Sequence, residues 1–325
     1  MKFFLHLLET IVWQGLDNPK SRHLAAGASS RGTRKGGVPP LCRRHFLQAG
    51  EPGRAECLGN PSTAPCSKIK NRISPMRLTY FGANSWLIEL GQQRILIDPW
   101  LVGSLVFGNL NWLFKGQRSK PLDAIPEQID LIVLSQGLED HAHRPTLEQL
   151  SRTIPIVASA SAAKVVQQLG YTQVATLAPG QTFTLGDRIE IHALAGAPIG
   201  LQVENAYLLK DKDSGTSLYY EPHGFPSAEV KNYAPVDVVI SPVVNLELPL
   251  VGAIIKGSKT ALQLAQWLRP QVFLPTAAGG DVEYEGLVNS LLRTVGSVEE
   301  LRSQFAQNNL STQVIDPRPG ESIEI

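Results

Sequence analysis

Four histidines lie between residue 76 and the C-terminus, and three of them fall on two short polar segments. His141 and His143 follow Asp140 in the first segment, and His223 lies in the second, whereas His192 stands alone in an expected strand. Imidazole and carboxylate groups bind metal ions and transfer protons near neutral pH, so these segments carry the chemistry that the sequence offers. The structural alternative is that Asp140 caps the next helix and that the histidines are polar loop residues.

Apolar runs and turn residues predict the elements that position these segments. Strands are expected at 77–81, 85–90, 94–98, 130–135, 154–158, 173–177, 181–185, 188–194, 205–210, 216–220, 236–241 and 271–275, with two more at the C-terminus. Helices are expected at 145–152, 160–169, 227–233, 258–268, near 283–295 and at 297–308. Hairpins at both ends with α/β units between them predict one domain over residues 76–325, with two sheets layered between helices.

Three segments together resemble the metallo-β-lactamase superfamily, especially its lactonase-like branch of small metal-dependent hydrolases. The strand ending in Asp98-Pro99 is similar to the end of that family's opening hairpin. Ser135-Gln-Gly-Leu-Glu-Asp140-His141 resembles the signature Thr-His-x-His-x-Asp-His, and Ser217-Leu-Tyr-Tyr-Glu-Pro-His223-Gly stands where the family has a strand ending in Gly-Asp. The resemblance covers residues 76–325 in order and implies a four-layer αββα sandwich.

The signature is degenerate. Gln136 and Leu138 replace its two leading histidines, and the segment 194–198 lacks the next family histidine. Thr276 or Ala277 stands where the family has its last histidine. Because the family's first metal position loses all three histidines, a two-metal hydrolase is not expected.

A single metal ion is still compatible with the resemblance. Asp140, His141 and His223 are implied as a 2-His-1-carboxylate set for one zinc or iron ion. With Asp140, the other implied catalytic residue is His143, which would shuttle the proton. The implied activity is hydrolysis of an ester, lactone or similar bond by one metal-bound water.

Several alternatives stay open at this stage. His143, Asp281 or Glu283 can replace the lost fourth ligand, and Asp98 is expected to be a structural, loop-bonding carboxylate rather than a catalytic one. The signature can also be a relic, with no metal bound. The protein would then be a catalytically inactive member of the fold that binds a hydrophobic ligand, a membrane surface or a partner.

Residues 99–114 form an apolar segment without a charge, called the flap below. Its large aromatic residues are Trp100, Phe107, Trp112 and Phe114. A second apolar loop, 246–255, is expected at the same edge of the fold. Such loops line a pocket for an apolar small molecule, touch a membrane surface, or form a small satellite core.

Residues 1–75 differ in composition from the rest. They hold 12 Lys and Arg against 4 Asp and Glu. They are also rich in Pro, Gly, Ser and Arg and show no sustained hydrophobic periodicity, which predicts a disordered basic extension. Two explanations are open. Either Met76 is the true start, which favours a cytoplasmic protein, or the extension is a transit peptide for a plastid or other organelle.

The remaining residues, 76–325, exclude two classes of function. They hold 18 Lys and Arg against 25 Asp and Glu, so this acidic body is not expected to bind nucleic acid. All three cysteines precede residue 76, at Cys42, Cys57 and Cys66. Residues 76–325 therefore contain neither a disulfide nor a thiolate metal site. The oligomeric state is not predicted by these features.

Overall fold

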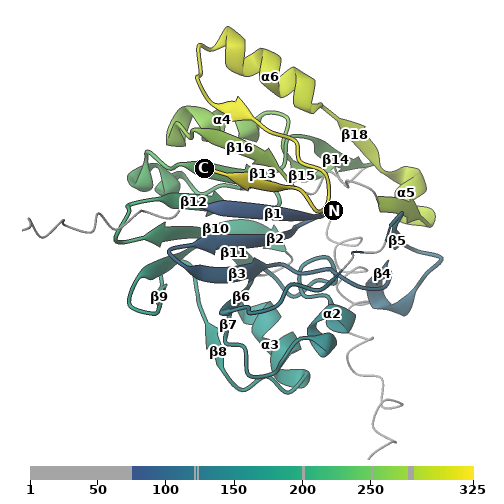
Figure 1. Cartoon of the computed structure of the whole chain (residues 1–325). Coiled ribbons are helices and arrows are strands. Elements are labelled where there is room, and N and C mark those ends of the chain that lie inside the picture. The colour runs from purple at the N-terminus through teal and green to yellow at the C-terminus, as the bar shows by residue number, and fades with distance from the viewer. Residues whose placement is uncertain (1–74, 121, 123, 200–201, 250–251, 277–281) are drawn as a thin grey trace, which may run out of the picture. The chain divides into compact units, whose positions relative to one another are not determined.

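Two seven-stranded sheets pack face to face in the computed structural model (Figure 1). The structure describes residues 75–325 except 121, 123, 200–201, 250–251 and 277–281. The extension expected over residues 1–75, apart from Pro75, lies outside the described residues. The first sheet has the order β20 (Ser322–Glu324), β1 (Arg77–Gly82), β2 (Ser85–Leu90), β3 (Gln93–Ile97), β6 (Leu131–Leu134), β7 (Ile156–Ala158) and β8 (Val174–Thr176). The second has the order β19 (Gln313–Val314), β16 (Val272–Pro275), β13 (Val238–Ser241), β12 (Ser217–Tyr220), β11 (Gln202–Asp211), β10 (Ile189–Ile199) and β9 (Thr182–Leu185).

Side chains alternate between the two faces of each sheet, as the period of two in a strand requires. In β2, Trp86 and Ile88 lie in the core between the sheets, whereas Leu87 packs on the opposite face. In β3, Ile95 lies in the same central core and Leu96 on the outer face. Each sheet therefore has a second apolar face that helices must cover.

Helices cover these outer faces and complete four layers. The helices are α2 (Arg144–Gln149), α3 (Ala160–Gln168), η3 (Ala228–Tyr233, a 3-10 helix), α4 (Thr260–Leu268), α5 (Leu287–Leu291) and α6 (Val298–Gln307). Helices α2 and α3 pack on the first sheet, and η3, α4 and α6 pack on the second. Ser297 caps α6 by accepting a hydrogen bond from the Glu300 N–H, the capping-box spacing. The predicted αββα sandwich is confirmed.

Local sequence signals placed most of these elements. The hairpin expected at Gly186-Asp187 joins β9 and β10, and both turn residues have positive φ, as a type I′ turn requires. The prediction of one helix near 283–295 is wrong. That segment forms β17 (Val282–Glu285), the short α5 and β18 (Arg293–Val295), because Val282–Glu285 pairs with a strand from the distant flap region.

The two apolar loops form small sheets that the sequence pattern did not predict. One sheet joins β17 to β5 (Lys115–Arg118) and β4 (Leu105–Val106), which is followed by the one-turn 3-10 helix η2 (Phe107–Asn109). The other joins β15 (Gly252–Lys256), β14 (Asn245–Leu248) and β18. Antiparallel pairing between segments far apart in the chain therefore gives both loops regular structure.

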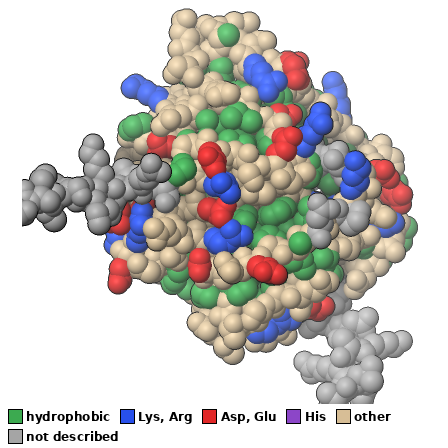
Figure 2. Space-filling model, viewed as in Figure 1, with side chains coloured by type: hydrophobic (Ala, Val, Ile, Leu, Met, Phe, Trp, Pro, Cys, Tyr) green, Lys and Arg blue, Asp and Glu red, His purple; other side chains and the backbone are tan. Residues whose placement is uncertain are grey.

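The surface carries charges of both signs. On the face shown in Figure 2, basic and acidic side chains lie interspersed with apolar ones, so no single-sign field dominates that face. None of the described helices combines the length and apolar composition that a membrane crossing requires.

A bidentate ion pair at the end of β11 leads to a stability prediction. Arg188 donates to both carboxylate oxygens of Asp211 at 2.7 Å, and this hydrogen bonding holds the pKa of Asp211 at about 2. Asp211→Asn is expected to lower the free energy of unfolding by about 1 kcal/mol at neutral pH, an amount reduced by solvent screening of Arg188. Urea denaturation measures the loss.

The pH dependence has a defined sign. Because the folded-state pKa of Asp211 lies below the ordinary value of 3.8, its stabilisation is present above that pH. It disappears as the pH falls toward 2. The control is Asp213→Asn, which removes a 71% exposed carboxylate 3.3 Å from the same arginine and is expected to have little effect. Equal losses for both variants would contradict the prediction.

Candidate metal centre

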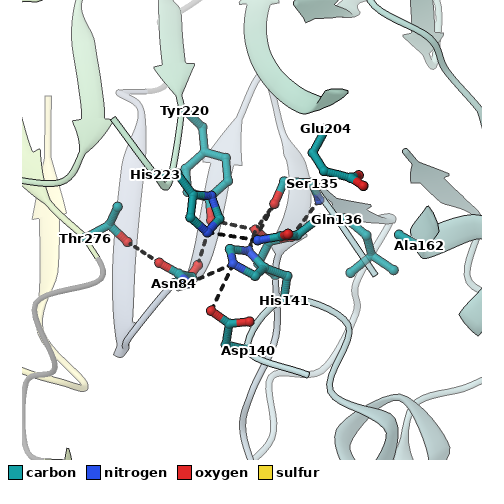
Figure 3. Close-up of polar contacts among 12 residues, drawn as sticks. Asn84, Ser135, Gln136, Asp140, His141, Ala162, Glu204, Tyr220, His223 and Thr276 are labelled. Carbon is teal, nitrogen blue, oxygen red and sulfur yellow. Dashed lines mark hydrogen bonds and ion pairs between the residues drawn. The ribbon is translucent and has the colours of Figure 1, made fainter. Parts of the chain in front are cut away.

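The candidate site lies where β3, β6, β12 and β16 end. Strands β3 and β6 run parallel in the first sheet, and β12 and β16 each run parallel to β13, which lies between them in the second. Because the carboxyl ends of parallel strands meet at one edge, the segments that follow them converge. The turn between β1 and β2 lies there as well, since β2 runs antiparallel to β3. Figure 3 shows the resulting group of side chains.

His141 is fully buried and lies between two carboxylates. Its Nδ1 donates to Asp98 Oδ2 at 2.7 Å, and its Nε2 lies 3.1 Å from Asp140 Oδ2. Burial opposes protonation, but the charges of Asp140 and Asp98 outweigh it and raise the pKa of His141 to about 10. The same pairing holds the pKa of Asp140 below its usual value despite burial.

Asp98 organises the floor of the site. Its carboxylate accepts hydrogen bonds from the Ser135 N–H at 2.8 Å, from the Ser135 hydroxyl and from the Tyr220 hydroxyl at 2.6 Å, in addition to His141. The side chain is inaccessible to solvent. Asp98 was expected to be a structural, loop-bonding carboxylate. It bonds the Ser135 segment and also holds the ring of His141 in place, as carboxylates commonly do for metal-binding histidines.

His223 enters the site from the segment after β12. Its ring lies 4.9 Å from the ring of His141, and burial together with the charge of His141 lowers its pKa to about 3. Glu221 shapes this segment, since its carboxylate accepts from the backbone N–H groups of His223, Gly224 and Phe225. His223 is therefore neutral and retains a lone pair for a metal.

Two amides lie beside the two imidazoles. Gln136 Nε2 lies 2.9 Å from His223 Nε2, and Asn84 Nδ2 lies 3.2 Å from His141 Nε2. Thr276 donates to Asn84 Oδ1 at 3.2 Å. Of these three residues, sequence reasoning assigned none a role in the site. The signal for Gln136 was its place in the signature segment, and Thr276 was considered only as the substitute for a lost histidine.

The donor set fits a metal ion. Ligand atoms of Asp140, His141 and His223 all lie within 4.8 Å of one another. The second oxygen of Asp140, Oδ1, is buried and has no hydrogen-bond partner among the residues that the structure describes. Two imidazoles and one carboxylate with open positions suit zinc or ferrous iron. The three residues predicted as ligands are thus brought together, although His141 must release its Nε2 proton to bind an ion.

His143 lies apart from this cluster. Its Nδ1 is 2.9 Å from the Thr146 hydroxyl, and its Nε2 donates to the Ser104 carbonyl at 3.2 Å. Burial lowers its pKa to about 4, so the ring is neutral. These contacts join α2 to the flap, and the predicted role of His143 as a proton shuttle stays a prediction.

The other candidate residues are spread along the flap and β17. Glu283 is exposed and accepts from the Ser119 hydroxyl at 3.4 Å, whereas Asp281 and Ala277 lie outside the described residues. In the flap, Trp100 is buried in a satellite cluster against which Phe107 and Phe114 pack. Trp112 is 64% exposed. The flap thus has both a small core of its own and one exposed aromatic residue.

The family is shown by comparison with known proteins. The family described as beta-lactamase superfamily domain matches residues 77–277. The chain belongs to this superfamily. This match confirms the resemblance drawn from the Asp98, Asp140-His141 and His223 segments, and it covers the strands and loops that build the site.

Relatives and solved structures give the superfamily context. The chain is 35% identical over 91 residues to the cytidine monophosphate-N-acetylneuraminic acid hydroxylase of Mus musculus. These 91 residues make up 28% of this chain and 15% of that protein. The inactive human form is 32% identical over 91 residues, 28% of this chain and 18% of that protein. The matches thus span less than a fifth of the length of these curated relatives.

Two solved structures share the fold. Igni18, described as a novel metallo hydrolase from Ignicoccus hospitalis, has a TM-score of 0.56 at 20% identity and covers 78% of this chain and 99% of its own. CmlA, a diiron beta-hydroxylase from Streptomyces venezuelae, has a TM-score of 0.50 at 14% identity and covers 78% of this chain and 54% of its own. At these identities the likeness shows the fold alone.

Proposed function

We propose that the protein is a single-metal hydrolase that cleaves an ester- or lactone-type bond in an apolar substrate. The observation that supports it is the convergence of Asp140, His141 and His223 beside a buried carboxylate oxygen without a partner. The superfamily includes a structure described as a metallo hydrolase, which is consistent with this chemistry. Hydrolysis needs only water as a second reactant.

Each residue of the cluster has a defined task in this proposal. Asp140, His141 and His223 would hold the ion, which when bound acidifies a water molecule and polarises a carbonyl group. Asp98 fixes the orientation of His141 through its 2.7 Å hydrogen bond to Nδ1. Glu221 fixes the backbone that presents His223. Burial of His141 and Asp98 strengthens the electrostatic contact between them.

The apolar character of the substrate is inferred from the flap. The satellite cluster includes Ala83, next in the chain to Asn84 of the site. At the outer end, the backbone of Trp112 accepts from the Leu287 N–H at 3.0 Å, and both side chains are more than half exposed. Leu291, on the same short helix, is 43% exposed. An acyl chain would bind to these exposed side chains at the outer end of the flap.

The test is hydrolysis of a panel of esters and lactones with short and long acyl chains. Full-chain protein loaded with zinc, and separately with ferrous iron without oxygen, is expected to hydrolyse long-chain members. A chelator is expected to abolish the activity and fresh metal to restore it. No hydrolysis with either metal would contradict the proposal. Oxygen consumption by the iron form with an added reductant would instead favour the hydroxylation named for the relatives.

Trp112→Ala is expected to weaken binding of long acyl chains selectively. Because the side chain is 64% exposed, the stability should barely change. Loss of its contact with an acyl chain should raise KM for long-chain esters about 10-fold and leave short-chain esters unaffected. Trp267→Ala is the control, since Trp267 lies on α4 beside Lys231. An equal change for short and long chains would argue against the flap as an acyl-binding surface.

A further inference from the structure

We propose that Gln136 supplies a fourth protein donor to the metal through its side-chain oxygen. The inference rests on the proposed function and concerns the same site. Gln136 replaces a histidine of the signature, and sequence reasoning alone regarded it as a poor ligand. In the structure its side chain is 1% exposed and lies against His223 (Figure 3).

The first observation is the unpartnered oxygen of this amide. Within the described part of the chain, Gln136 Oε1 is buried and has no hydrogen-bond partner, and the same is true of Asp140 Oδ1. A buried polar atom without a hydrogen-bond partner destabilises the folded protein. Both oxygens belong to residues that contact the His141 and His223 pair. A cation bound at the two imidazoles would take Asp140 Oδ1 as a ligand, and it would take Gln136 Oε1 once the amide turns that oxygen toward His223.

The second observation is that the backbone at Gln136 is held firmly. The Gly137 N–H donates to the Ser161 hydroxyl at 2.8 Å, and that hydroxyl donates to the buried Glu204 carboxylate at 2.9 Å. A Cβ atom at Gly137 would lie 2.8 Å from the Ser161 carbonyl carbon, so only glycine fits there. The chain therefore presents the Gln136 side chain to His223 with little freedom to retreat.

The third observation is the spacing of the polar atoms. Two ligands of one six-coordinate ion with bonds of roughly 2.1 Å lie about 3 Å apart. Gln136 Nε2 is 2.9 Å from His223 Nε2, and Asp140 Oδ2 is 3.1 Å from His141 Nε2. A half-turn about the last side-chain torsion exchanges the nitrogen and oxygen of the amide. It places Oε1 at ligand spacing from His223.

The resulting donor set has a consequence for metal preference. Two imidazole nitrogens, one carboxylate and one amide oxygen contain more oxygen than the family's histidine-rich positions. Oxygen donors and six-coordinate geometry suit Mn²⁺ and Fe²⁺, whereas nitrogen donors in a tetrahedron suit Zn²⁺. Gln136 should therefore shift the relative affinity toward Mn²⁺ and Fe²⁺.

Metal titration of the full chain tests the inference without an activity assay. Chelator-treated protein is titrated with Mn²⁺, followed by electron paramagnetic resonance, and with Co²⁺, followed by its visible spectrum. Gln136→Leu is expected to weaken Mn²⁺ binding at least ~10-fold and to change the cobalt spectrum. Gln136→Glu should bind Mn²⁺ more tightly than the wild type. Gln136→His should raise the ratio of zinc to manganese affinity.

The control and the contrary outcomes are specific. Gln304→Leu removes another buried amide oxygen without a partner, on α6, and should leave both titrations unchanged. Wild-type affinity and spectrum in Gln136→Leu would overturn the inference and leave the single-metal site standing. Absence of metal binding by the wild type would overturn both. If Gln136→Leu does not fold, as judged by circular dichroism, an unchanged Mn²⁺ affinity in Gln136→Glu overturns the inference.

Discussion

Replacing His223 with alanine is expected to reduce the bound metal from about one equivalent to background and to abolish turnover. His223 is neutral, because burial lowers its pKa to about 3, and it provides one of the three converging ligand atoms. Asp140, His141 and the weak amide donor of Gln136 remain, and this set is expected to lose the ion, because a catalytic zinc is held by about three strong protein ligands. Elemental analysis of untagged protein measures the loss, and Asp140→Ala is expected to give the same result.

The matched control is His192→Ala. His192 lies on β10, with its ring near Tyr233 and its Nδ1 2.9 Å from the Thr182 hydroxyl, outside the metal cluster. That variant should keep its metal. Full metal content or activity in His223→Ala would refute the assigned ligand set. Metal-free wild-type protein would refute the single-metal function and leave binding of an apolar ligand as the alternative.

Asp98→Asn is expected to lower the free energy of unfolding by about 3–5 kcal/mol, with a fall of roughly 10 °C in Tm. The buried carboxylate accepts hydrogen bonds from Ser135, Tyr220 and His141. An amide in its place presents an NH₂ group to donors and leaves Asp140 as the one remaining carboxylate beside the charge of His141. Denaturant and thermal unfolding measure this loss.

Asp187→Asn is the control for this prediction. Asp187 has φ +58 in the exposed β9–β10 turn, and Asp98 has φ +41. Both aspartates therefore have a left-handed backbone conformation, but Asp187 is exposed and Asp98 is buried. A change within about 0.5 kcal/mol is expected there. If the two substitutions had similar effects, the hydrogen-bond network around Asp98 would not be the source of the stability.

Much of the fold follows from local pattern. The strand expected at 85–90 is the observed β2, and its alternation of Trp86, Leu87 and Ile88 shows which residues face each layer. Such signals are local, because the strand period and turn residues act within a few positions. The segment 283–295 was misassigned since its structure depends on pairing with β5, more than 160 residues earlier.

The candidate ligands could be named from the sequence, but their surroundings could not. Asp140, His141 and His223 stood out by residue type and by family resemblance, and the structure brings them together. His143 lies two residues from His141, yet its ring bonds Thr146 and Ser104 instead. Proximity in the chain therefore did not predict proximity in the site.

Sequence by itself determined the layered fold, the superfamily and the presence of two imidazoles and a carboxylate on converging loops. Only the tertiary structure decided that Asp98 holds His141, that Tyr220 closes the same network from the other sheet, and that Gln136 faces His223. The physical reason is that strand alternation is a local property. Hydrogen-bond partners 43 to 122 residues apart instead meet only where the ends of assembled strands come together.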